Sequence, residues 1–216
     1  MHETYLTPDR KALLHNWLSE QLSSQSWTLT PLAGDASFKR YHRCTTDSLS
    51  YIVAEALPEH LSLKPTITLT QTLLNADMPV PKIYATHLEH GFILQEDLGD
   101  QTLWHLRDTS AFFEHTHHAL GYLHQWQQLP ITDWPDMDAD MLLQECQLLP
   151  TWLLPHCKQT WNETDQAQYR TLCQTLIDAI EPRTFVPVHR DFHSRNLMIK
   201  DQKLYIQAGG GVVYDS

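Results

Sequence analysis

Several features that would indicate a secreted or membrane-bound protein are scarce in this 216-residue sequence. Its four cysteines, at positions 44, 146, 157 and 173, form no Cys-x-x-Cys pair, which argues against a disulfide framework and against a zinc site. No apolar run approaches the roughly 18 residues that a membrane span needs. The start, Met1 to Thr4, lacks the basic and then apolar character of a signal peptide. We therefore predict a cytoplasmic protein with reduced thiols and no membrane partner.

Basic side chains are also few. Fifteen basic residues against twenty-six acidic ones give a formal net charge of −11, so a nucleic-acid backbone is a poor partner. A nucleotide phosphate would have to be met by a few local cations and by Mg²⁺. The hydrophobic content of 42% is enough for a core, and the length suits one large domain or two small ones.

The greatest density of reactive side chains lies in residues 188–199. Apolar runs on both sides predict two short strands that hold these polar residues on a loop. Asp191 is followed five residues later by Asn196 and preceded two residues earlier by His189, a spacing typical of phosphotransferases. The pattern predicts that Asp191 takes a proton from the acceptor, Asn196 offers its carbonyl oxygen to Mg²⁺, and His189 braces the loop. The alternative is a structural turn in which Asp and Asn cap backbone groups.

This His-x-Asp-x-x-x-x-Asn run resembles the catalytic loop of the aminoglycoside phosphotransferase and choline kinase family, which is distantly related to the protein kinases. The resemblance implies an α+β, protein-kinase-like fold with two lobes and ATP as the phosphoryl donor. The expected lobes are an antiparallel N-terminal sheet with two helices over residues 1–95, and a truncated, mainly helical lobe over residues 101–216.

The apolar pattern breaks at residues 96–100, which is the best candidate for a hinge between the lobes. In the family this hinge holds the edge of adenine with backbone groups, so the resemblance assigns nucleotide binding to Gln95, Glu96, Asp97 and Leu98. A plain surface loop is the alternative.

A turn of small residues, Gly34-Asp35-Ala36-Ser37, lies between two alternating segments that predict strands. Small residues let backbone N–H groups approach a phosphate, and the Ser37 hydroxyl adds a donor, although ordinary turn chemistry explains the same residues. With the residues that follow, including Tyr51 to Glu59, this turn is similar to the start of the sugar kinases that phosphorylate N-acetylmuramate and N-acetylglucosamine at C1. A sugar substrate is therefore expected.

One cation of the kinase pattern is absent. In protein kinases the strand that corresponds to Tyr51–Ala54 ends near a lysine that contacts phosphates, whereas this chain has Ala54-Glu55. Lys39 and Arg40 are the nearest candidates for that contact; the alternative is a solvated basic pair.

Helical spacing of apolar residues predicts helices over about residues 8–23, 110–126, 141–154 and 164–179. Residues 65–77 carry conflicting signals, because Thr66 to Thr70 has strand period, but Pro65 suits a first helical turn and favours a helix. Within residues 141–154, the resemblance assigns Glu145 and Trp152 to the acceptor pocket, and Arg195 is assigned to it as well; packing is the alternative for Trp152.

The resemblance fails near the end of the chain. Where the family continues with Asp-Phe-Gln-Asp, whose first Asp binds Mg²⁺, this sequence has Gln207-Ala208-Gly209-Gly210-Gly211. We therefore expect a truncated family member whose second metal ligand is missing. Two alternatives stay open: a catalytically impaired nucleotide-binding fragment or pseudokinase, and a kinase of an aminoglycoside or a choline-like alcohol.

Overall fold

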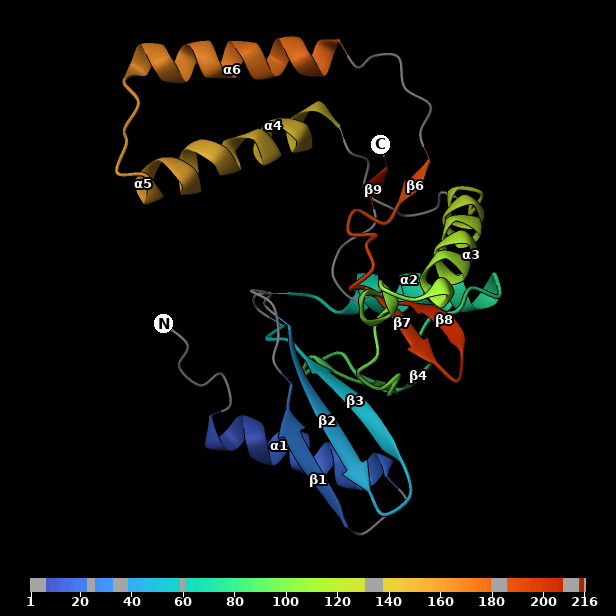
Figure 1. Ribbon diagram of the computed structural model, residues 1–216. Helices are drawn as coiled ribbons and strands as arrows, with labels where there is room; N and C mark the ends of the chain where they lie inside the picture. The colour runs from blue at the N-terminus through green and yellow to red at the C-terminus, as the bar shows by residue number, and fades with distance from the viewer. Residues whose placement is uncertain are drawn as a thin grey trace. The chain divides into compact units, whose positions relative to one another are not determined.

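The structure, a computed structural model, describes residues 7–22, 26–32, 39–58, 61–130, 138–179, 186–207 and 214–215 (Figure 1). By contacts the chain divides into two units. One consists of Met1–His124 and Asp191–Val212, and the other of Gln125–Arg190 and Val213–Ser216. The lobes expected at residues 1–95 and 101–216 are defined by their predicted roles in nucleotide binding and catalysis, and not by contacts. That division remains a prediction.

The first unit contains the antiparallel sheet that the sequence predicts, in the order β1-β2-β3-β5-β4. Its strands are β1 (Trp27–Pro31), β2 (Arg40–Thr46), β3 (Ser50–Glu55), β4 (Ile83–His87) and β5 (Phe92–Glu96). Side chains alternate across the sheet, so neighbouring residues of one strand face opposite sides. Val53 and Ala54 of the central strand are both buried, which means that both faces of the sheet are covered.

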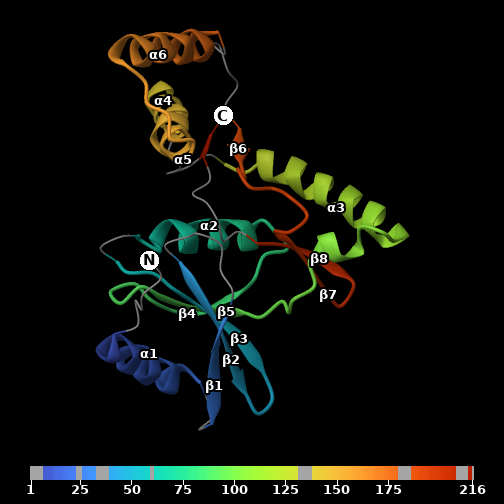
Figure 2. The same cartoon turned by 60° about the vertical axis from the view of Figure 1, so that its left-hand side comes forward.

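Helix α1 (Pro8–Gln21) covers one face (Figure 2). It begins after Thr7, whose hydroxyl accepts a hydrogen bond from the backbone N–H of Arg10. The buried side of α1, with Trp17 and Leu18, packs in one cluster with Val53 and Phe92 of the sheet. Burial of a side chain such as Leu18 contributes about 2 kcal/mol.

Helix α2 (Lys64–Asn75) covers the other face, where Ile67 packs against Ala54 and Ile93. The helix predicted for residues 65–77 is thus confirmed in spite of its threonines. Thr70 donates its hydroxyl proton to the backbone carbonyl of Thr66 at 2.8 Å, a bond that places a β-branched polar residue inside a helix.

The turn between β4 and β5 requires glycine at one position. Gly91 has φ +68°, and a Cβ added there would lie 2.0 Å from the backbone oxygen of Ala56. Ala56 N–H in turn donates to the carbonyl of Gly91 at 3.0 Å, so the two backbones touch directly.

The first unit continues through a 3-10 helix (Leu103–Leu106) and most of α3 (Ser110–Gln127). It resumes with the hairpin of β7 (Leu197–Lys200) and β8 (Lys203–Ile206). Asp201 and Gln202 at the tip of this hairpin have φ +50° and +60°, as a tight two-residue turn requires.

The second unit contains α4 (Ala139–Leu148), a π-helical turn (Leu149–Leu153), α5 (Leu154–His156), α6 (Glu163–Asp178) and the two-stranded pair of β6 (Pro187–Val188) with β9 (Tyr214–Asp215). The single helix predicted over 141–154 is therefore interrupted. Pro150 lacks an N–H and crowds the preceding turn, which explains a wider turn at this place. Among the described residues, no helix is long and apolar enough to cross a bilayer.

Candidate active site

A cavity of about 90 Å³ lies against the segment that the sequence predicts to be the hinge. Gln95, Glu96 and Leu98 line it, together with Tyr41 of β2 and Met198 of β7. Burial raises the pKa of Tyr41 to about 12, so its phenol is neutral. The predicted hinge residues are therefore brought together at one cavity, with the exception of Asp97.

Asp97 is buried and pairs with Arg43 of β2. Arg43 donates from Nε and Nη2 to the two carboxylate oxygens of Asp97, at 2.7 and 3.1 Å, and also to both oxygens of Asp100, at 3.0 and 2.8 Å. Burial alone would raise the pKa of Asp97, but the hydrogen bonds from Arg43, Gly99 N–H and Ser50 outweigh it and hold that pKa below its usual range. Arg43 thus fastens β2 to the predicted hinge.

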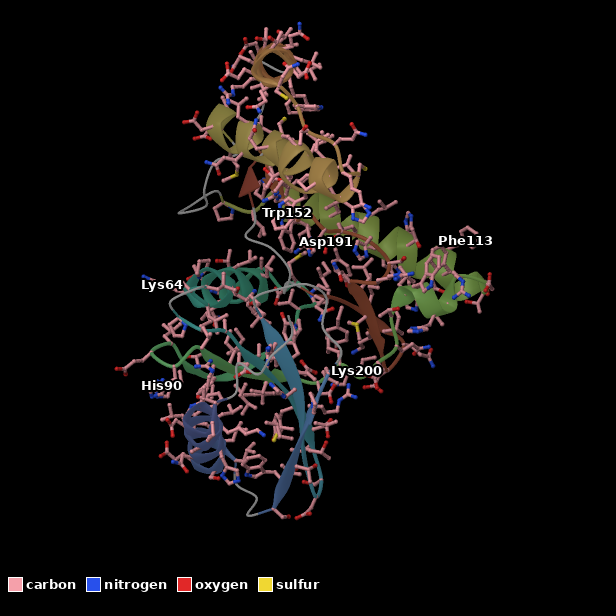
Figure 3. The ribbon with its side chains drawn as sticks, turned by 90° about the vertical axis from the view of Figure 1, so that its left-hand side faces the viewer. Lys64, His90, Phe113, Trp152, Asp191 and Lys200 are labelled. Carbon is pink, nitrogen blue, oxygen red and sulfur yellow. The ribbon has the colours of Figure 1, made fainter. Side chains whose placement is uncertain are left out.

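Lys200, at the end of β7, fastens the other side of the predicted hinge (Figure 3). Its ammonium group donates to Glu96 Oε1 and to the backbone oxygen of Asp97, both at 2.9 Å. The hydrogen bond that Lys200 donates to the Glu96 carboxylate raises the pKa of Lys200. Neither Arg43 nor Lys200 was predicted from the sequence, because nothing in their local context distinguishes them from solvated basic residues.

The predicted catalytic loop brings Asp191 and Asn196 together. Asn196 donates from Nδ2 to Asp191 Oδ2 at 2.6 Å and to the backbone oxygen of Asp191 at 3.0 Å. Because both bonds use the NH₂ group, the carbonyl oxygen of the Asn196 amide is the atom that can bind a cation. The Asp191 side chain is 52% exposed and therefore accessible to an acceptor.

His193 is a further member of this cluster that the sequence argument missed. The backbone N–H of Arg195 donates to His193 Nδ1 at 3.2 Å, which makes Nδ1 an acceptor and places the ring proton on Nε2. Nε2 lies 3.0 Å from Asp191 Oδ1 and can donate to it. Each oxygen of Asp191 therefore has its own donor. The signal available in the sequence was a histidine two residues after the aspartate.

Backbone hydrogen bonds fix the loop to its surroundings. Trp104 N–H donates to Ser194 O at 3.0 Å, and Gln207 N–H donates to Asn196 O at 2.9 Å. Arg190, immediately before Asp191, has φ +64°, a left-handed conformation that costs roughly 1–3 kcal/mol in a non-glycine residue. Such strain beside a reactive side chain is typical of functional loops.

The other predicted site residues of the first unit, and the candidate Arg40, lie in different surroundings from one another. Lys39 is buried, and its ammonium group donates to Thr66 of α2 at 2.9 Å. Arg195 lies with its guanidinium carbon 5.4 Å from the ring centroid of Trp104. Arg40 lies on the face of β2 that α1 covers. The turn of residues 34–37 lies outside the described residues.

In the second unit, His189 is buried and its ring centroid lies 5.0 Å from that of Trp126. Glu145 forms an ion pair with Arg190. Trp152, on the π-helical turn, is 71% exposed, so it is not a core residue of the described structure (Figure 3). Their assignment to the loop and the acceptor remains a prediction.

Asn196 and Asp191 both carry oxygen atoms of the kind that bind a metal ion. In the part of the chain that the structure describes, no three His, Cys, Asp or Glu side chains cluster to hold an ion. The amide oxygen of Asn196 is a hard donor of the kind that Mg²⁺ prefers. The predicted role of Asn196 as a metal ligand is consistent with this chemistry and remains a prediction.

Comparison with known proteins indicates the same class of protein as the loop of Asp191 and Asn196 does. The sequence model of the phosphotransferase enzyme family matches residues 28–206. An N-acetylmuramate/N-acetylglucosamine kinase of Pseudomonas putida is 32% identical over 194 residues, which cover 84% of this chain and 57% of the relative. The kinase of the same name from Neisseria meningitidis is 30% identical over 200 residues, or 88% and 58% of the two chains. This chain belongs to the phosphotransferase enzyme family.

Solved structures show the same fold. A choline kinase from Streptococcus pneumoniae superimposes with a TM-score of 0.66 at 15% identity, over 96% of this chain and 70% of its own. A spectinomycin phosphotransferase in complex with ADP and spectinomycin gives 0.67 at 12% identity, over 94% and 70%. These likenesses confirm the predicted kinase-like α+β fold. The chain spans somewhat less than three-fifths of the length of the sugar kinases that it matches.

Proposed function

We propose that this chain is a cytoplasmic, ATP-dependent phosphotransferase whose acceptor is the anomeric hydroxyl of N-acetylmuramate or N-acetylglucosamine. Membership of the family supports the reaction class, and the names of the similar kinases support the acceptor. The observation that carries the proposal is the carboxylate of Asp191, which is half exposed and held on both oxygens by Asn196 and His193.

In the proposed mechanism Asp191 accepts the proton of the sugar hydroxyl as the hydroxyl oxygen bonds to the γ-phosphorus of ATP and the bond to ADP breaks. His193 and Asn196 act as positioning residues, because they fix the plane of the carboxylate before the acceptor arrives. Mg²⁺ bound to the nucleotide would neutralise phosphate charge, with Asn196 Oδ1 as its donor from the protein.

Lys39 is the proposed replacement for the missing kinase lysine. Tyr41 pairs with Ala54 across β2 and β3, and Lys39 precedes Tyr41 by two residues, so it belongs to the same face and lies diagonally from Ala54. That face is the one on which Ile67 of α2 packs against Ala54. Burial lowers the pKa of Lys39, and a nearby phosphate would raise that pKa again by favouring the charged form. Residues 34–37 would cover the phosphates, and residues 96–100 would serve as the hinge between lobes 1–95 and 101–216.

The test is phosphorylation of N-acetylmuramate and N-acetylglucosamine by the purified chain with ATP and Mg²⁺, followed by ³¹P NMR. Asp191→Asn is expected to lower the rate about 10³-fold, the usual contribution of a general base. Asp201→Asn is the matched control, because Asp201 is exposed at the tip of the β7–β8 hairpin and asparagine tolerates its positive φ. Equal rates in both variants would remove Asp191 from the reaction.

A nucleotide-binding protein without transferase activity is the second candidate, favoured because the described residues hold no cluster of three His, Cys, Asp or Glu side chains for a metal ion. It predicts that ATP raises the thermal midpoint while no sugar is phosphorylated. Choline and an aminoglycoside belong in the same panel, because phosphorylation of either one alone would move the acceptor class away from amino sugars.

A further inference from the structure

The second unit has a cavity of its own beside α4 and α6, two helices that run in opposite directions and are joined through α5 (Figure 1). Its volume of about 340 Å³ is within the range of small-molecule sites. The described residues that line it all belong to the stretch 147–170, so the cavity is formed within this unit. Glu145 and Trp152, the predicted acceptor residues, do not line it.

Two aromatic side chains form one wall of this cavity. The ring centroids of Trp161 and Tyr169 lie 4.9 Å apart, with the ring planes at 55° to each other. Hydrogen bonds hold this wall in place: the phenol of Tyr169 donates to the backbone oxygen of Cys146 at 2.8 Å, and Gln166 Nε2 donates to the backbone oxygen of Trp161 at 3.2 Å. Both rings are only half-buried. The wall therefore offers a ligand a fixed, flat apolar surface.

The rest of the lining is mostly polar and uncharged. The side chains of Gln147, Thr151, Gln159 and Thr160 line the cavity and form no hydrogen bond or ion pair with any described residue. Each amide and each hydroxyl group among them can both donate and accept a hydrogen bond. Arg170 is the one charged side chain in the described part of the lining, and it adds further donors. This lining suits a neutral ligand that is rich in hydroxyl groups.

We propose that this cavity, which we call the α4–α6 pocket, binds a neutral pyranose sugar that is not the phosphoryl acceptor. The C–H groups on one face of the sugar ring would pack on Trp161, because the face of an aromatic ring attracts their partial positive charge. The sugar hydroxyls would bond to the glutamine and threonine side chains at the rim. The proposal does not depend on the phosphotransferase reaction, since the pocket requires no reactive hydroxyl.

The probe is methyl β-cellobioside, a neutral glycoside whose anomeric oxygen is blocked. It is titrated into the full chain labelled with ¹⁵N in its tryptophan indoles and followed by NMR. The Trp161→Phe variant identifies the Trp161 signal by removing it. We expect this signal to shift saturably with the glycoside and not with sorbitol, because sorbitol has similar hydroxyls but no ring face to pack on the indole.

Affinities of the variants are measured by saturation-transfer NMR, which does not require the Trp161 signal. Trp161→Ala should weaken binding about tenfold, and Trp161→Phe, which keeps an aromatic face, should weaken it less. Thr160→Val removes one hydrogen bond at an exposed position and should weaken binding about fivefold. Thr164→Val is the matched control, because Thr164 is an exposed threonine of α6 that does not line the pocket.

The proposal is overturned if the Trp161 signal does not shift saturably, if sorbitol shifts it equally, or if Thr164→Val weakens binding as much as Thr160→Val does. The pair of threonine variants keeps the test valid even if Trp161→Ala does not fold. Loss of binding in Trp152→Ala together with normal binding in Trp161→Phe and Thr160→Val would also overturn the proposal, because the glycoside would then occupy the predicted acceptor pocket.

Discussion

Each face of the five-stranded sheet carries a carboxylate that pairs with an arginine from another segment of the chain. On the face of the predicted hinge, Arg43 of β2 pairs with the two carboxylates of Asp97 and Asp100. On the face that α1 covers, Arg10 of α1 pairs with the buried Glu55 of β3. Successive side chains of β2 point to opposite faces of the sheet, so the basic residues of this strand lie on both faces.

The two faces also differ in how deeply their ion pairs are buried. The side chains of Arg10 and Glu55 are 11% and 2% exposed, whereas those of Arg43 and Asp100 are 23% and 80% exposed. Removal of one partner of a buried pair leaves an uncompensated charge, and the cost falls as water gains access. Stability should therefore depend more on the α1-face pair than on the hinge-face pair.

Arg10→Met should give the largest loss, about 3 kcal/mol of unfolding free energy, because Glu55 would be left buried without its cation. Urea unfolding measures this loss of unfolding free energy. Arg107→Met is the control, because Arg107 pairs with Asp108 at an exposed site. Its loss should cost less than about 0.5 kcal/mol. The double variant Arg10→Met/Glu55→Gln should recover part of the loss. Equal effects of Arg10→Met and Arg107→Met would contradict the assigned role of burial.

Arg43→Met should come next, with a loss of about 2 kcal/mol, because Asp97 keeps the Gly99 N–H bond but loses its charged partner. If the proposed nucleotide site is correct, the same variant should bind ADP more weakly than the parent, since Arg43 lines the cavity beside the predicted hinge. Calorimetric titration with ADP separates these effects. Destabilisation without any change in ADP affinity would show that this cluster supports the fold and not the nucleotide.

The effect of Arg43→Met should depend on pH. The pKa of Asp97 is lowered in the folded chain, so its contribution is complete above the unfolded pKa of about 4 and is lost as the pH falls through the lower, folded value. The difference in stability between parent and variant should therefore be constant from pH 7 to 5 and shrink below pH 4. A difference that stays constant down to pH 3 would show that Asp97 is not the group that Arg43 stabilises.

Sequence reasoning succeeded where the signal is local. The spacing of Asp191 and Asn196 predicted that they share one loop, and their side chains do form a hydrogen bond, although their catalytic roles remain predictions. Proline signals on both sides, beginning with Pro65, favoured the helix that the structure has at α2. The same sequence argument could have included His193, because this residue lies two positions after Asp191 on a loop already predicted to be reactive.

What the sequence did not predict depends on the register of the sheet. Arg43 meets Asp97 and Asp100 across 54 and 57 residues, and Lys200 meets Glu96 across 104 residues. These partners come together only because β2, β3 and β5 pair as they do and β7 reaches the predicted hinge. A shift of one residue in any strand would send its side chains to the other face, so such pairs cannot be found before the pairing is known.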